Sequence, residues 1–218
     1  MKIKNIFIIF FEFLLSLLNS KSDFKKYDKL KINDVDSIKI EDLPEEFGKE
    51  AFKTIDEFIK KTAYLNHEWL LYFDYKTGEI LRCIEGKKDE VKITFENDEF
   101  EGYHVASIHN HPLDVISPPS GKNFGILLRE FEEYELIASK NELWILKAKP
   151  VDIHLANEIN LFAIYFFNAA EIQADNYYDD EEMKDKYISI AYGESLLNYI
   201  NDKNIKDIQL TKKRYEND

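Results

Sequence analysis

Residues 103–112 read YHVASIHNHP, an apolar strand that runs directly into two histidines and a proline. Side chains two positions apart on an extended segment point the same way. We therefore expect the imidazoles of His109 and His111 to lie side by side where the strand ends, with Pro112 stiffening the exit. Two such imidazoles can bind one metal ion. This segment predicts a buried strand and a candidate site at its end.

The rest of the chain alternates between helical and extended patterns around this strand. A helix is expected from about residue 43, because Asp42 can cap it and Pro44 suits its first turn. A helical pattern returns after Pro150 and is expected to continue to the end of the chain. The expected strands are Trp69–Phe73, Ile80–Ile84, Val91–Phe95, Tyr103–Ile108, Leu136–Ala138 and Leu143–Leu146, and the other expected helices are 120–131, 153–175 and 180–200.

This order of elements predicts an α/β fold in three parts. Residues 1–42 are expected to form an N-terminal apolar helix and a polar connector, and residues 43–149 a helix–sheet–helix core. Residues 150–218 are expected to form a C-terminal extension of two helices.

Charge and cysteine content exclude several classes of protein. The 218 residues include 29 Lys and Arg against 42 Asp and Glu, which gives a net charge of -13. Most of this surface repels a phosphate backbone and no basic stripe is visible, so we expect no nucleic-acid partner. Cys83 is the only cysteine, which excludes an internal disulfide framework and a zinc site built from several cysteines.

The N-terminal segment 5–18 is strongly apolar but is interrupted by Glu12. It is shorter than the roughly 20 apolar residues that span a bilayer, and no small-residue cleavage site follows it. We favour an amphipathic helix docked on the protein and a cytoplasmic location. A secretion signal or lipoprotein-like leader, and a helix that binds a membrane surface or a partner, are the alternatives left open.

Three further residues are candidates for chemistry in the same region. Glu68 begins the strand 69–73 and could shuttle a proton to and from a metal-bound water. Ser120 can cap the helix that follows the histidines, and Asn123 lies three residues later, where its oxygen can approach the same ion. Taken singly, a His–x–His pair or a lone glutamate is more often structural, so the prediction depends on their combination.

The order of these residues resembles the motif of the JAB/MPN (JAMM) metalloprotease family, particularly its bacterial and phage members and its RadC-like branch. That motif is a Glu at the start of a strand, then His-x-His-Pro, then Ser-x-x-Asp. Here Glu68 precedes its strand, residues 109–112 read HNHP, and residues 120–123 read SGKN. The resemblance covers roughly residues 45–149, about half of the chain.

The resemblance implies an α/β/α sandwich around a mixed sheet, with one Zn²⁺ and a hydrolase or isopeptidase activity. By carry-over, His109, His111 and Asn123 would ligate zinc. Glu68 would act as general base and acid, and Ser120 would donate a hydrogen bond to the oxyanion. The implied substrate is a peptide or a ubiquitin-like protein.

Two departures from the motif keep a second function open. The loop 113–119 is one residue longer than usual, and Asn123 replaces an aspartate with a neutral amide. Carboxylate, imidazole and thiolate are the ligands that zinc prefers, and Asp114 is an alternative source of a carboxylate. The leading hypothesis is a zinc-dependent metallopeptidase, and the alternative is a catalytically impaired JAMM-like module that binds a protein. A third hypothesis treats the histidines as structural in an interaction domain. The sequence does not specify the substrate or the oligomeric state.

Overall fold

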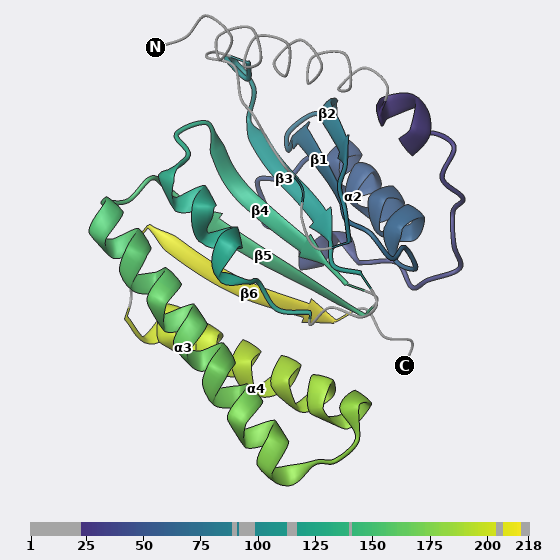
Figure 1. The fold of residues 1–218 in the computed structure, drawn as a ribbon. Helices are drawn as coiled ribbons and strands as arrows, with labels where there is room; N and C mark the ends of the chain where they lie inside the picture. The colour runs from purple at the N-terminus through teal and green to yellow at the C-terminus, as the bar shows by residue number, and fades with distance from the viewer. Residues whose placement is uncertain are drawn as a thin grey trace, which may run out of the picture.

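The computed structural model describes residues 23–88, 91, 99–112, 117–139, 141–203 and 207–214. It has the predicted α/β fold, with a six-stranded mixed sheet at its centre (Figure 1). The strand order is β2-β1-β3-β4-β5-β6, and β3 and β4 run parallel while every other neighbouring pair is antiparallel. The strands are β1 (Trp69–Asp74), β2 (Ile80–Glu85), β3 (Val105–Asn110), β4 (Glu132–Ala138), β5 (Glu142–Ala148) and β6 (Ile208–Arg214).

Helices cover both faces of the sheet and make three layers (Figure 1). The helix α2 (Lys49–Thr62) packs on one face, where its buried side chains join those of β1, β3, β4 and β5 in one apolar core. The 3-10 helix η2 (Gly121–Leu128) and the helices α3 (Ile153–Tyr177) and α4 (Glu181–Asp202) cover the other face in a second core. A shorter 3-10 helix, η1 (Ile40–Asp42), precedes α2.

Alternation along the strands decides which polar residues face the second layer. In β1, Trp69, Leu71 and Phe73 pack against α2, whereas Leu70 and Tyr72 face the other way. Glu68, Leu70 and Tyr72 are spaced two apart, so Glu68 points to the same face as the other two. In β3 the odd positions Ser107 and His109 alternate with Ala106 and Ile108, which lie in the α2 core. The candidate site therefore lies on the face opposite α2.

The helix α2 and the C-terminal segment differ from the sequence predictions. The helix begins at Lys49 rather than near residue 43, because residues 43–48 form turns and Gly48 occupies the N-cap position.

The end of the chain is not wholly helical, because β6 adds to the sheet beside β5. The strand β6 was missed because only Ile208 and Leu210 are apolar and buried, while lysines follow them. The other predicted elements are present with ends shifted by a few residues, except Val91–Phe95, most of which lies outside the described residues.

The N-terminal predictions concern residues that are mostly outside the described part of the chain. The apolar segment 5–18 is among these, so the alternatives for it stay open. Residues 23–27 of the polar connector are helical, and Tyr27 from this turn is buried against Phe58 and Trp69. Among the helices that the structure describes, none has the length and apolar character needed to cross a membrane.

Candidate functional site

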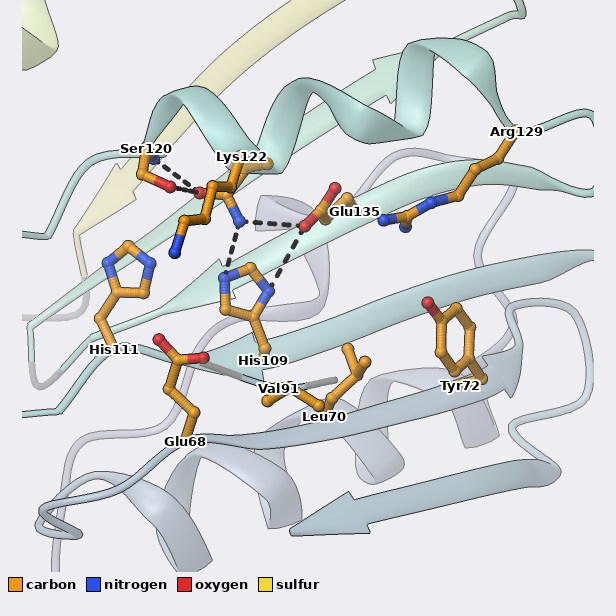
Figure 2. A pocket seen from close by; sticks show the side chains of 11 residues that line it. Glu68, Leu70, Tyr72, Val91, His109, His111, Ser120, Lys122, Arg129 and Glu135 are labelled. Carbon is orange, nitrogen blue, oxygen red and sulfur yellow. Dashed lines mark hydrogen bonds and ion pairs between the residues drawn. The ribbon is translucent and has the colours of Figure 1, made fainter. Parts of the chain in front are cut away.

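All five residues predicted for the site line one pocket of about 170 Å³ at the end of β3 (Figure 2). Glu68 comes from the start of β1, the two histidines from the end of β3 and the residue after it, and Ser120 and Asn123 from the start of η2. The prediction that these residues lie close together is therefore confirmed. The remaining lining residues are Leu70, Tyr72, Val91, Lys122, Arg129 and Glu135.

Asn110, the residue between the histidines, positions Glu68. Its Oδ1 accepts a hydrogen bond from the backbone N–H of Trp69 at 2.6 Å, and its Nδ2 donates to the carbonyl of His67 at 3.1 Å. These two bonds clamp the residues on either side of Glu68 to the end of β3. Glu68 also pairs with the start of the segment after β2 through its own backbone N–H and carbonyl. The role of Asn110 was not predicted from the sequence, because its two hydrogen bonds reach a strand that is distant along the chain.

Asn110→Ala is expected to lower the free energy of unfolding by about 2–3 kcal/mol, because it leaves the buried backbone N–H of Trp69 without its acceptor. Urea denaturation measures this loss. Asn168→Ala, at an exposed position of α3, is the matched control and should change stability by less than about 0.5 kcal/mol. An Asn110→Ala chain as stable as the control would contradict this role.

His109 and His111 lie side by side, as the alternation of the strand predicts, with their ring centroids 5.2 Å apart. Each is 6% exposed. Burial holds the pKa of His109 well below its usual value, and the charges of His111 and Arg129 lower this pKa further. The His109 ring is therefore neutral at neutral pH. Its Nδ1 lies 3.5 Å from Oε1 of Glu135, and its Nε2 faces the NH₂ of Asn123, which can only donate, so Nε2 is an acceptor and the ring proton lies on Nδ1.

Asn123 satisfies this acceptor with its own side chain. Its Nδ2 lies 3.0 Å from Nε2 of His109 and donates a second hydrogen bond, at 3.1 Å, to Oε1 of Glu135. Its Oδ1 accepts from both the backbone N–H and the hydroxyl of Ser120, at 2.6 and 2.9 Å. Turning the amide would set its NH₂ against the Ser120 N–H, so the backbone fixes its orientation.

These hydrogen bonds bear directly on the zinc that the resemblance implies. A zinc ion held by the predicted ligands would need a free Nε2 on His109 and a free oxygen on Asn123, and both are engaged. The Lys122 ammonium also extends toward the space beside the two rings (Figure 2). Within the described ranges, no cluster of three or more His, Cys, Asp or Glu side chains could hold a metal ion.

The side chains as arranged therefore do not fit zinc between His109, His111 and Asn123. Zinc binding stays a prediction that requires Asn123 to turn. The alternative carboxylate, Asp114, lies outside the described residues. The hydroxyl of Ser120, predicted to face an oxyanion, donates to Asn123 instead.

Glu135 is the main residue of the pocket that sequence analysis missed. It lies in β4, is 4% exposed, and contacts both His109 and Asn123. Burial, together with the nearby carboxylate of Glu132, raises the pKa of Glu135 to about 8. The strand EEYELIA contains three glutamates, and Glu135 is the one flanked on both sides by apolar residues, Tyr134 and Leu136, which is the signal that the sequence carried.

Glu135→Gln should stabilise the protein increasingly as pH rises from about 5 to 8. In this range Glu135 keeps its proton in the folded chain, whereas in the unfolded chain, where its pKa is the ordinary 4.5, it has lost it. The free energy of unfolding of the native chain therefore falls as pH rises. The stability difference between variant and native chain should grow by about 1.4 kcal/mol per pH unit. Urea denaturation at several pH values measures it. Glu130→Gln, at an exposed position, is the control, and a pH-independent difference for Glu135→Gln would contradict the raised pKa.

An ion pair between Arg129 and Glu132 lies close to Glu135, and Arg129 lines the same pocket. Nη1 of Arg129 lies 2.6 Å from Oε2 of Glu132, whose side chain is fully buried. The Ser107 hydroxyl donates to the other oxygen of Glu132. Burial raises the pKa of Glu132, and Arg129 opposes this shift. The buried charged and polar groups on this side of the pocket thus form two neighbouring pairs, Arg129 with Glu132 and His109 with Glu135.

Comparison of the chain with protein-family models, curated proteins and solved structures finds no match.

Proposed function

We propose that this protein is a JAMM-like domain that binds a peptide segment in the histidine pocket and does not catalyse its zinc-dependent hydrolysis. The observation that carries the proposal is the set of hydrogen bonds made by Asn123. This amide accepts from Ser120 with its oxygen and directs its N–H groups to His109 and Glu135. An aspartate could accept from Ser120 with one oxygen and offer the other to a metal, but the amide offers only N–H on that side.

The pocket retains groups that suit a peptide backbone. The Glu68 carboxylate accepts hydrogen bonds, and the Lys122 ammonium donates them. Both residues also line a larger adjoining cavity of about 560 Å³, so a ligand can extend beyond the histidines. Cavities of several hundred cubic ångströms with a few polar groups are typical binding sites.

A second candidate is the zinc-dependent peptidase or isopeptidase, and one observation favours it. Glu68, His109, His111 and Ser120 converge on one pocket, and the Nδ1 of His109 faces a carboxyl group, as second-shell partners of metal-bound histidines do. This function requires the Asn123 amide to leave Ser120 and turn its oxygen toward the histidines.

Metal content and peptide binding separate the two candidates. The native chain is purified after growth with added zinc, its zinc is measured by mass spectrometry, and its hydrolysis of a peptide library is followed. Binding to an acetylated, amidated peptide library is compared between the native chain and Glu68→Arg, which fills the pocket. Glu79→Arg, at an exposed position beyond β1, is the control for the change in charge.

The proposal expects much less than one zinc per chain, no hydrolysis, and peptide binding that Glu68→Arg abolishes and Glu79→Arg preserves. One tightly held zinc per chain together with peptide hydrolysis would overturn it in favour of the second candidate. Peptide binding unaffected by Glu68→Arg would place the binding surface elsewhere and would also overturn it.

A further inference from the structure

The larger cavity is an apolar groove between the start of η2 and the helices α3 and α4. Its volume is about 560 Å³, against about 170 Å³ for the histidine pocket. The two cavities share Glu68, His111, Ser120 and Lys122, so they form one continuous site. The other residues that line the groove are Pro118, Gly121, Asn160, Ala163, Ile164, Phe167 and Tyr192.

The walls of this groove are held by specific contacts. The hydroxyl of Tyr192 on α4 donates to the carbonyl of Pro119 at 2.5 Å, which ties α4 to the loop before η2. The start of η2 lies against α3, because a Cβ built at Gly121 would lie 2.4 Å from Oδ1 of the Asn160 side chain. The groove is therefore built into the packing of η2 against α3 and α4.

The apolar wall includes a side chain that remains exposed to solvent. Ile164 lines the groove and is 48% exposed. An exposed apolar side chain in the wall of a cavity favours an apolar ligand group, because burying that surface is favourable.

The polar end of the groove offers charges of both signs. Lys122 forms no ion pair with any residue that the structure describes, and its ammonium reaches into the space shared by both cavities (Figure 2). The Glu68 carboxylate also points toward this space (Figure 2). The last residue of a polypeptide has a matching set of groups: a backbone N–H, an α-carboxylate and a side chain.

We infer that the site binds the carboxyl-terminal end of a polypeptide whose last residues are apolar. The apolar side chain lies in the groove against Ile164 and Phe167. The α-carboxylate pairs with the Lys122 ammonium, and the N–H of the last residue donates to Glu68. A charge-assisted hydrogen bond to Lys122 gives preference for a free carboxylate over an amide. This inference rests on the proposed peptide-binding function and names its ligand class.

The test uses two sets of fluorescein-labelled peptides and measures binding by fluorescence anisotropy. Each peptide has a Gly-Ser spacer and ends in three positions drawn from Leu, Ile, Val and Phe. One set has a free carboxyl terminus, and the other has the same sequences with a terminal amide. The free-acid set should bind about tenfold more tightly than the amide set, the difference expected for one charge-assisted contact.

Variants of the two ends of the site make the test specific. Lys122→Met should weaken the free-acid set about tenfold and the amide set much less, because the amide loses one neutral acceptor's hydrogen bond and the carboxylate loses its charged partner. Ile164→Asp should weaken both sets at least tenfold by placing a charge in the apolar groove. The controls are Lys149→Met, outside both cavities, and Leu161→Asp, which is 66% exposed on α3 and does not line the groove.

Equal binding of both peptide sets, or a Lys122→Met effect that is the same for acid and amide, would overturn the carboxylate contact. An Ile164→Asp chain that binds like Leu161→Asp would overturn the apolar groove. In either case, the proposed function would stand if the native chain binds the acetylated, amidated peptides and Glu68→Arg does not. If the native chain does not bind these peptides, the proposed function itself is wrong.

Discussion

Asn123→Asp is expected to bind zinc about 100-fold or more tightly than the native chain, because it supplies the carboxylate that zinc prefers and removes the N–H that occupies His109. One carboxylate oxygen can keep the hydrogen bonds from Ser120, and the other can face the histidines. Titration with a competing chromophoric chelator measures the affinity of both chains. The matched control, Asn168→Asp, adds the same charge at an exposed position of α3.

The same variant without zinc should be less stable than the native chain. Aspartate cannot donate to Nε2 of His109 or to Glu135, so both acceptors lose the amide hydrogens that lie near them now. A loss of about 1–3 kcal/mol is expected for buried polar groups left unsatisfied, and added zinc should reverse it. A variant that binds zinc no better than the native chain would contradict the role assigned to Asn123.

Arg129→Met should lower the free energy of unfolding by about 3–5 kcal/mol at neutral pH, because it leaves the fully buried carboxylate of Glu132 without its cation. Thermal and urea denaturation measure the loss. The loss should shrink as the pH is lowered, because burial raises the pKa of Glu132 and the variant can neutralise this carboxylate by taking up a proton.

A double-mutant cycle identifies the cause of that loss. Arg129→Met combined with Glu132→Gln should recover most of the stability, because no buried charge remains unpaired. Arg82→Met is the control, since its pair with Glu99 is partly exposed and should contribute about 1 kcal/mol or less. A double variant no more stable than Arg129→Met would show that the arginine acts through packing and not through its charge.

The sequence was sufficient to predict the fold class and the grouping of the site residues. Alternation on an extended segment places His109 and His111 on one side, and this local rule of backbone geometry holds without knowledge of the packing. Glu68 was grouped with them by its place in the JAMM-like motif, and it reaches them because β1 pairs with β3. The assignment of Ser120 to the start of η2 is local in the same way.

The missed features depend on contacts between segments far apart in the chain. Glu135 reaches the site only because β4 pairs in parallel with β3, and Asn110 acts through a strand 41 residues earlier. The polar and apolar residues of β6 give a weak pattern, and its place beside β5 follows from tertiary packing. The orientation of the Asn123 amide could not be predicted from the sequence either, because it depends on contacts with Ser120, His109 and Glu135 together.

The position of the ring proton on His109 distinguishes a pocket closed by the Asn123 amide from a zinc site. Long-range ¹H–¹⁵N NMR of histidine-labelled protein reports whether each ring nitrogen carries a proton, accepts a hydrogen bond or binds metal. With one equivalent of zinc present, we expect His109 to keep its proton on Nδ1 and its Nε2 signal to stay unchanged. A shift of the Nε2 signals of His109 and His111 to metal-bound values in the native chain would contradict it.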